Sequence, residues 1–297
     1  MGASSPFAQS SAGGLRLLHR RSLPPAQVLA AIEAHRANAA RGREHCEQWG
    51  PGSSVSRILL RRPEGDLDLA VKWNHPRGLR AAVGERLRGS RAQRALDGAE
   101  RLAALGLAHA PVWAVAERRA PGRVLESHLL CEFLAGSAPL PAVMPELLAD
   151  RARRWRVATE IGRVVGALHA VGLDHRDFKH SNLLVTPDDR VALLDLDSLV
   201  PPRRPGWRGR VRALGQLEVY ATDLYPQLPR SERARVLRAY LEQNPALRPR
   251  RRELVAGARR WVEARLSEWA TRDRSDHIYF PLAPRPPLAP TVVEVSE

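Results

Sequence analysis

One segment near the middle of the chain limits its fold more than any other. It begins with a stretch from Trp155 to Ala170 whose apolar residues recur at helical spacing, and it continues into the polar sequence His175-Arg-Asp-Phe-Lys-His-Ser-Asn182. A short apolar strand, a turn and a second apolar run follow, and the second run ends at Asp195-Leu-Asp197. The order is therefore helix, polar loop, short hairpin and acidic pair. It predicts that the polar side chains of the loop lie close to one end of the hairpin.

Lysine is almost absent from the chain. Of 47 basic residues only Lys72 and Lys179 are lysine, which leaves 47 − 2 = 45 arginines. The ammonium group is a compact point charge, whereas guanidinium is a broad planar fork, so the two are not interchangeable where a phosphate is bound. We therefore take both lysines as candidate functional residues, and Lys179 already lies within the polar loop.

Lys72 ends a predicted strand. Apolar and polar residues alternate from Asp66 to Lys72, as they do in a half-buried strand. A glycine- and serine-rich turn precedes the hairpin that contains this strand, and its residues are Gly50, Gly52, Ser53 and Ser54. Backbone N–H groups of such a turn can bind a polyphosphate, with a lysine of the next strand reaching the same group. An ordinary turn with no ligand is the other interpretation.

Together these segments resemble the protein-kinase-like fold. His-Arg-Asp followed by four residues and Asn182 matches its catalytic loop, and Asp195, thirteen residues later, matches its metal-binding aspartate. Within that fold the chain resembles the lipopolysaccharide kinase (Kdo/WaaP) family. The features that carry this resemblance are HRDFKHSNLLV, the ending Leu-Leu-Asp-Leu-Asp197 in place of Asp-Phe-Gly, and the stretch from Ser90 to Gly106. The resemblance spans residues 45–245 and implies an α+β, bilobal fold with a small antiparallel β-rich N-terminal lobe and a mainly helical C-terminal lobe.

Composition and resemblance divide the chain into four parts. We expect a disordered N-terminus over residues 1–22, because this segment is small, polar and basic. An N-terminal extension helix and the small nucleotide-binding lobe should cover residues 23–134, and the large catalytic lobe residues 135–280. A proline-rich extended tail is expected over residues 281–297. Helical spacing of apolar residues predicts helices over 24–41, 231–241 and 252–269.

The resemblance implies catalytic roles for four residues. Asp177 would accept or orient the proton of the attacking hydroxyl, and Lys179 would reach the γ-phosphate of ATP. Asn182 and Asp195 would hold Mg²⁺, a hard ion that prefers oxygen ligands. The expected chemistry is phosphotransfer from ATP to an alcohol group, catalysed mainly by positioning and charge neutralisation.

The resemblance also implies a nucleotide-binding set. Lys72 would bind the α- and β-phosphates, beside the turn that runs from Gly50 to Ser54. The run that ends at Leu134 resembles the last strand of the small lobe and the hinge, so main-chain groups of Glu132 and Leu134 would bind adenine. A structural role is the alternative for the Glu132 side chain.

Two positions depart from the kinase pattern. The helix glutamate that pairs with the strand lysine would fall near Ala95, and alanine cannot supply a carboxylate. Asp97, Glu100 or Glu85 could replace it, although each is also typical of an exposed helix position. Asp197 stands where protein kinases have glycine, and either a metal-ligating or a structural role is open for it.

The resemblance implies that the acceptor is a hydroxyl of a lipopolysaccharide inner-core sugar, Kdo or heptose. The segment from Leu199 to Val219 contains no Ser, Thr or Tyr, which argues against activation-loop phosphorylation. Its arginines could bind a phosphorylated or carboxylated sugar, or lie on the solvated surface. They are Arg203, Arg204, Arg208, Arg210 and Arg212. The alternatives are a kinase for Ser/Thr of proteins or for a small alcohol such as an aminoglycoside, and a catalytically silent nucleotide-binding pseudokinase scaffold.

Charge and hydropathy limit the partners and the location. The net charge of 47 − 32 = +15 raises nucleic acid or an anionic membrane as partners, but replacement of lysine by arginine throughout weakens the case for nucleic acid. No apolar run approaches the roughly 18 residues of a membrane span. Cys46 and Cys131 indicate neither a disulfide nor a zinc site. We expect a cytoplasmic protein, with peripheral contact to the inner membrane left open.

Overall fold

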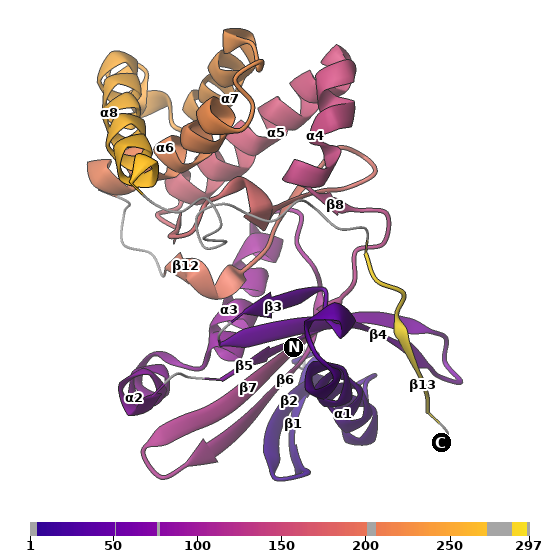
Figure 1. The fold of residues 1–297 in the computed structure, drawn as a ribbon. Coiled ribbons are helices and arrows are strands. Elements are labelled where there is room, and N and C mark those ends of the chain that lie inside the picture. Colours follow the sequence, from indigo (N-terminus) through magenta and orange to yellow (C-terminus); the bar gives the residue numbers. More distant parts are fainter. Residues whose placement is uncertain (1–4, 51, 76–77, 201–205, 272–286, 296–297) are drawn as a thin grey trace. The chain divides into compact units, whose positions relative to one another are not determined.

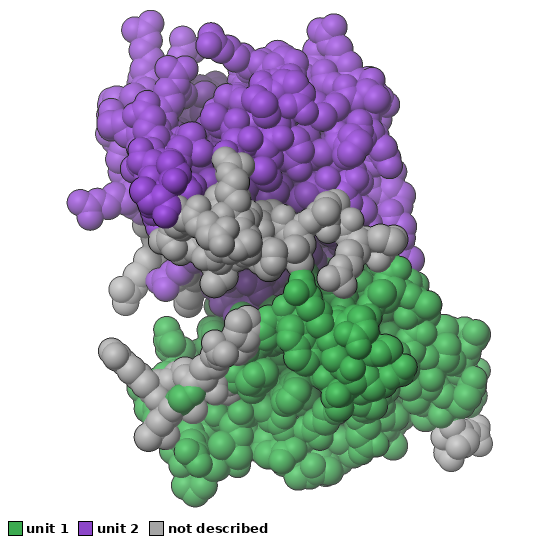
Figure 2. Space-filling view, in the orientation of Figure 1, with its two compact units in different colours: residues 1–101, 110–134, 286–297 green, residues 102–109, 135–285 purple. Residues whose placement is uncertain are grey.

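The computed structural model describes residues 5–50, 52–75, 78–200, 206–271 and 287–295, and the chain divides into two compact units (Figures 1 and 2). The first unit comprises residues 1–101, 110–134 and 286–297, and the second comprises residues 102–109 and 135–285. An antiparallel sheet dominates the first unit and helices dominate the second, which confirms the expected α+β class. No helix among the described residues combines the length and apolarity that crossing a bilayer requires.

An eight-stranded sheet forms the first unit. Its order is β1-β2-β6-β7-β5-β4-β13, with β3 paired to the same strand β4. All pairs are antiparallel except β13 with β4. The strands are β1 (Phe7–Ala12), β2 (Leu15–Arg20), β3 (Gln48–Gly50), β4 (Ser53–Arg61), β5 (Leu67–Asn74), β6 (Val112–Ala120), β7 (Arg123–Glu132) and β13 (Thr291–Glu294).

Strand alternation directs Lys72 away from the core of this unit. Leu69 and Val71 of β5 are completely buried, and they pack with β4 and with α1 (Pro25–Arg41), the helix expected over residues 24–41. Successive strand residues point to opposite faces of a sheet. Lys72 and Ala70 therefore lie on the face of β5 opposite the core, where both are half-buried.

Residues 7–20 form regular structure, contrary to the expectation of disorder over residues 1–22. Residues 7–20 form the β1–β2 hairpin, whose two-residue turn Gly13-Gly14 has φ values of 57° and 71°. Such turns require left-handed backbone, which glycine adopts without steric cost. Leu15 and Leu17 are 1% and 3% exposed within the core, so two leucines anchor a segment of otherwise polar composition. The prediction is wrong for residues 7–20, and residues 1–4 lie outside the described part.

The C-terminal segment adds a strand to the first unit. β13 pairs in parallel with β4, and the Val295 N–H donates to the Arg61 carbonyl at 3.1 Å. The Asn38 side chain on α1 donates to Thr291 Oγ1 at 2.8 Å, and Val293 packs against the core. The expected proline-rich extended tail is therefore in part a strand of the sheet, while residues 281–286 and 296–297 are not described.

Two helices follow β5, and a set of helices and short strands makes up the second unit. The helices after β5 are α2 (Gly78–Arg88) and α3 (Arg91–Ala104). Those of the second unit are α4 (Leu140–Ala149), α5 (Arg151–Ala170), α6 (Trp207–Asp223), α7 (Arg230–Gln243) and α8 (Arg251–Ala270). The helices predicted over 231–241 and 252–269 correspond to α7 and α8. Four short 3₁₀ helices are η1 (Arg43–His45), η2 (His180–Asn182), η3 (Leu196–Ser198) and η4 (Pro245–Leu247).

Short strands in the second unit position the polar loop. β8 (Ala138–Pro139), β10 (Leu183–Val185) and β11 (Val191–Leu193) form one small sheet, and β9 (Asp174–His175) pairs with β12 (Leu199–Val200). Asn182 immediately precedes β10 and Asp195 follows β11. Because β10 and β11 are antiparallel neighbours, these two residues lie at the same end of the hairpin.

Candidate active site

The polar loop after α5 brings Asp177, Lys179 and Asn182 together. Helix α5 is capped by Asp150, which accepts from the Arg153 N–H at 2.9 Å, and the chain leaves the helix through Gly172 with φ 87°. In the loop, Asp177 Oδ2 accepts a hydrogen bond from Asn182 Nδ2 at 3.1 Å and lies 2.9 Å from Lys179 Nζ. Both members of the ion pair are about one third exposed, as a group that meets substrate must be.

Main-chain contacts join this loop to the segment that carries Asp195. The His175 ring donates from Nε2 to the Leu194 carbonyl at 3.1 Å, and the Arg176 N–H donates to the Ser198 carbonyl at 3.1 Å. The Leu194 N–H in turn donates to the Asn182 carbonyl at 2.9 Å. These bonds connect both sides of the loop to residues 194–198, so the loop and the acidic segment are held as one assembly.

Asp195 adopts an uncommon backbone conformation. Its φ of 57° and ψ of 47° place it in the left-handed region, where only it and Asp189 occur among the described non-glycine residues. Aspartate enters this region more readily than most residues, but the conformation persists only where the surroundings hold it. The strain indicates that the position of this carboxylate is imposed by the fold.

Asn182 and Asp195 flank the β10–β11 hairpin at one end, and both carry side-chain oxygens of the kind that Mg²⁺ prefers. The amide nitrogen of Asn182 is used to hold Asp177, so its Oδ1 is the atom that a cation would take. Mg²⁺ uses one or two protein carboxylates and completes its shell with phosphate and water oxygens. No group of three or more His, Cys, Asp and Glu side chains suited to a metal occurs in the described parts of the chain. Two protein oxygens would be enough for an ion whose remaining ligands are phosphate and water oxygens.

The lysine of the first unit lies on the central part of the sheet. Lys72 is paired with Val55 of β4 and Leu129 of β7. Beside it, burial raises the pKa of the Cys131 thiol to about 11, against a smaller lowering by the Lys72 charge. Neither described cysteine is in a disulfide. Val55, Leu129 and the Cys131 thiol are thus strand neighbours of Lys72 on the central part of the sheet.

The glycine- and serine-rich turn joins β3 to β4. Gly50 pairs with Ser53, and the carbonyl of Gly52 accepts the His75 N–H at 3.1 Å. Ser54 differs from its expected role. Ser54 is 4% exposed and its hydroxyl lies 3.1 Å from Nε2 of His35 on α1, while its backbone lies in β4 between β3 and β5. Its side chain is therefore engaged within the first unit.

The expected hinge follows β7. The Glu132 N–H donates to the Pro111 carbonyl at 2.8 Å, and the Phe133 N–H donates to the Asp68 carbonyl at 2.9 Å. The Glu132 N–H is therefore already bonded, and the carbonyl is the Glu132 main-chain group left to accept a hydrogen bond from adenine. Leu134 is the last residue of the first unit before the chain enters the second.

One carboxylate among the three considered replacements for the missing helix glutamate is buried. Ala95 itself is 4% exposed on α3, while Glu100 is exposed and Asp97 accepts from Gln93 Nε2 at 2.9 Å. Glu85 is 6% exposed on α2, and α2 packs against β7, the strand next to that of Lys72. The expectation of an exposed position is therefore wrong for Glu85.

Two of the five arginines considered for the acceptor have structural partners. Arg210 donates to the Tyr240 hydroxyl at 2.8 Å and to Asn244 Oδ1 at 2.9 Å. Arg212 forms an ion pair with Asp174. These bonds tie α6 to α7 and to β9. Of the other three, Arg208 is exposed, and Arg203 and Arg204 lie outside the described residues.

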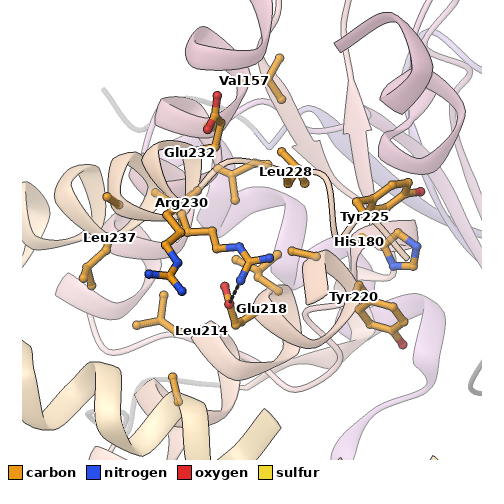
Figure 3. A pocket seen from close by; sticks show the side chains of 18 of the residues that line it. Val157, His180, Leu214, Glu218, Tyr220, Tyr225, Leu228, Arg230, Glu232 and Leu237 are labelled. Atoms are coloured by element: carbon orange, nitrogen blue, oxygen red, sulfur yellow. Dashed lines mark hydrogen bonds and ion pairs between the residues drawn. The ribbon is translucent and has the colours of Figure 1, made fainter. Parts of the chain in front are cut away.

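A cavity of about 660 Å³ lies among α4 to α8 of the second unit (Figure 3). Its lining is mainly aliphatic and includes Met144, Ile161, Leu214, Leu228 and Leu237. Figure 3 shows His180, Tyr220 and Tyr225 grouped at one side and Glu218 paired to an arginine, which is Arg233 at 2.7 Å. Sequence patterns did not indicate this cavity, because its lining follows the same apolar periodicity as an ordinary helix core.

His180 joins the cavity to the polar loop. It follows Lys179, is 3% exposed, and packs against Tyr220 with ring centroids 4.1 Å apart and ring planes tilted by 32°. Neither ring nitrogen has a hydrogen-bond partner within the described residues. Burial, with a smaller contribution from Lys179, lowers the pKa of His180 to about 4. The cavity thus contains a neutral imidazole one residue away from the candidate catalytic lysine.

Comparison with known proteins assigns the chain to a family. The sequence model of the Lipopolysaccharide kinase (Kdo/WaaP) family matches residues 78–240, which is more than half of the chain. A solved structure described as "WaaP in complex with acyl carrier protein" is similar with a TM-score of 0.57 and 24% identity, covering 84% of this chain and 98% of that one. No curated protein matches the sequence. The chain therefore belongs to the lipopolysaccharide kinase (Kdo/WaaP) family and is a kinase of the protein-kinase-like fold.

Proposed function

We propose that this kinase transfers the γ-phosphate of ATP to a hydroxyl of a lipopolysaccharide inner-core sugar, Kdo or heptose, at the cytoplasmic face of the inner membrane. The observation that carries the proposal is the convergence of Lys179 Nζ and Asn182 Nδ2 on one oxygen of Asp177. This arrangement supplies a base, a cation and a fixed orientation for the base, which are the protein contributions that phosphoryl transfer requires.

Each residue of the loop has one task in the proposed reaction. Asp177 accepts the proton of the sugar hydroxyl as its oxygen attacks the γ-phosphorus, and the bond from phosphorus to the β–γ bridging oxygen breaks to release ADP. Lys179 neutralises negative charge on the transferred group, and its Nζ lies 2.9 Å from Asp177 Oδ2, beside the atom that takes the proton. The chemistry therefore needs no covalent enzyme intermediate.

The nucleotide and its ion would be bound by the remaining predicted residues. Asn182 Oδ1 and the Asp195 carboxylate would hold Mg²⁺, which screens phosphate charge when bound. Lys72 would bind the α- and β-phosphates, together with main-chain N–H groups of the turn that contains Gly52 and Ser53. Glu85 would supply the carboxylate that orients Lys72, in place of the missing glutamate.

A parallel acceptor assay tests the proposal. The protein is incubated with γ-labelled ATP, Mg²⁺ and either a heptosylated Kdo-lipid A, casein or kanamycin. We expect label only on the lipid-linked sugar, loss of transfer with EDTA and its recovery with added Mg²⁺. Asp177→Asn should reduce transfer to a small residual rate, whereas Asp188→Asn, a change of an exposed aspartate in the β10–β11 turn, should leave it unchanged. Label on casein or kanamycin alone would overturn the choice of acceptor.

We further propose that the chain binds an acyl carrier protein, as in the complex described for WaaP. The supporting observation is the aliphatic cavity of about 660 Å³, which has the lining that an acyl chain requires. The net charge of +15 favours an acidic partner.

The second proposal has two parts, that a carrier protein binds and that the cavity holds its acyl chain. Comparing the binding of acylated and unacylated carrier protein tests them separately. The acylated form should co-elute with the kinase and raise its melting temperature more than the unacylated form. Ala221→Trp, which fills part of the cavity, should weaken only binding of the acylated form, and Ala246→Trp on the exposed surface should leave it unchanged. Equal binding of both forms would contradict a role for the cavity, and binding of neither would contradict the partner.

A further inference from the structure

A glutamine on α6 contacts the main chain on both sides of the candidate base. Gln216 Oε1 accepts the Phe178 N–H at 3.0 Å, and Gln216 Nε2 donates to the Arg176 carbonyl at 3.3 Å. Arg176 and Phe178 are the two sequence neighbours of Asp177. We infer that Gln216 is a positioning residue, which sets the direction of the Asp177 side chain by fixing the two peptide groups that flank it.

The loop geometry shows why both peptide groups matter. The Arg176 carbonyl belongs to the peptide before Asp177, and the Phe178 N–H belongs to the peptide after it. Rotation of either peptide would turn the bond from Cα to Cβ of Asp177 and move its carboxylate. The carbonyl of Asp177 is already held by Asn182 Nδ2 at 2.9 Å. This carbonyl and the Phe178 N–H belong to the same peptide group, so Asn182 and Gln216 restrain that group together. Among the described side chains, only Gln216 is seen to bond the carbonyl of the peptide before Asp177.

Helix α6 is well placed to act as the fixed support. Gly215, the neighbour of Gln216, lies so close to Trp261 of α8 that a Cβ at this glycine would be 2.6 Å from Cε3 of the ring. One turn further along α6, Val219 and Tyr220 are buried in a cluster that includes Trp269. Such close packing limits translation and rotation of a helix. The amide of Gln216 is thus presented to the loop from a rigid element.

The amide group is chemically suited to this task, because it offers an acceptor and a donor on one planar group. In Gln216→Glu, one carboxylate oxygen could still accept the Phe178 N–H. The other oxygen would face the Arg176 carbonyl, and two acceptors cannot form a hydrogen bond. Leucine has a similar shape and would remove both bonds. Phe178 is 1% exposed and packs edge-on against His175, so the loop has an independent anchor and the variants should fold.

Kinetics of these variants test the inference, which uses the kinase activity and not the identity of the acceptor. For Gln216→Leu we expect kcat to fall about 10- to 100-fold, as for displacement of a catalytic group by a fraction of an ångström, with KM for ATP nearly unchanged. Gln216→Glu should lie between wild type and Gln216→Leu. Gln227→Leu, at an exposed glutamine in the connection between α6 and α7, is the control and should leave kcat unchanged.

A double variant separates positioning from general stability. In an Asp177→Asn background, Gln216→Leu should cause no further loss of residual turnover, because the group it positions is already altered. An equal loss in both backgrounds, or a kcat of Gln216→Leu within about twofold of wild type, would overturn the inference.

Hydrogen exchange of the loop gives a readout that does not depend on any acceptor. Gln216→Leu should speed exchange of the Phe178 amide by about tenfold or more, while the amides of β10 keep their wild-type rates. Unchanged protection at Phe178 would overturn the inference even if the variant is inactive. Failure of the lipopolysaccharide acceptor in the transfer assay would leave both the exchange and the turnover measurements interpretable, so the two proposals fail separately.

Discussion

Lys179 Nζ lies 2.9 Å from Asp177 Oδ2, on the same oxygen that accepts the amide of Asn182. One carboxylate oxygen thus has two donors two and five residues further along the chain. These two contacts fix the orientation of the carboxylate and hold the ammonium of Lys179 next to it.

Replacement of Lys179 by methionine should separate binding from chemistry. The methionine preserves the aliphatic stem but removes the charge, so we expect kcat to fall by about 10²- to 10³-fold with little change in KM for ATP. Steady-state kinetics at saturating acceptor measures both constants. A rise in KM alone would show that Lys179 contributes to nucleotide affinity and not to the transferred phosphate.

Replacement of Glu85 by glutamine should reveal whether this buried carboxylate orients Lys72. Loss of one charge from a charge-assisted pair should raise KM for ATP by about tenfold or more. Glu100→Gln on the exposed face of α3 is the matched control and should behave as wild type. If the two variants have the same KM, another group orients Lys72.

Part of the candidate site could be predicted because its residues are close to one another in the sequence. Asp177, Lys179 and Asn182 lie within one loop, so the local chain determines which of them can meet. Gln216 could not be predicted, because it acts from 38 residues away on main-chain groups and leaves no pattern in the sequence. The cavity beside His180 was equally hidden, since aliphatic residues at helical spacing line a cavity or fill a core with the same periodicity.

For the fold as well, features set by neighbouring residues were predicted from the sequence, and features set by distant residues were not. Alternation predicted the strand ending at Lys72, but composition gave the wrong result for residues 7–20. There, Gly13-Gly14 followed by alternating Leu15 and Leu17 is a hairpin signal that the polar neighbours obscured. Ser54 was assigned to the phosphate turn, although its partner His35 comes from a helix whose position on the sheet only the tertiary fold determines.

Stability should fall as the pH is lowered from 6.5 to 4. Burial, the largest cause in each case, lowers the pKa of His35, His169 and His180 to about 4, against 6.5 in an unfolded chain. Between these values the unfolded chain binds protons that the folded protein excludes, so stability that is fully present above pH 6.5 is lost as the pH falls through 4. The loss is at most roughly 3 kcal/mol per histidine.

Urea unfolding at pH 7.5, 6 and 5 measures this dependence. His35→Gln removes one of the three groups and should make the change in unfolding free energy with pH shallower, whatever its effect at pH 7.5. A wild-type protein with equal unfolding free energies at pH 7.5 and 5 would contradict the prediction.

The contribution of β13 can be measured with two adjacent valines. Val293 packs against the core of the first unit and Val292 is 49% exposed on the opposite face. Val293→Ser should lower the free energy of unfolding by about 1 kcal/mol, because it removes apolar contacts and brings a hydroxyl to the core, while Val292→Ser should change it little. Denaturant unfolding midpoints of the two variants measure this difference. Similar midpoints would show that the packing of Val293 does not contribute to the stability of the protein.

The helices of the second unit depend on close contact at Gly162 of α5. A Cβ there would lie 2.8 Å from the Cβ of Ala239 on α7 and closer still to the carbonyl oxygen of Val236. Alanine normally stabilises a helix interior by about 1 kcal/mol relative to glycine, but here the overlap involves main-chain atoms that cannot rotate away. Gly162→Ala should therefore destabilise the protein by about 1–3 kcal/mol. Gly84→Ala on α2, where the nearest atom is the flexible end of Arg88, should be neutral or stabilising in the same thermal unfolding assay.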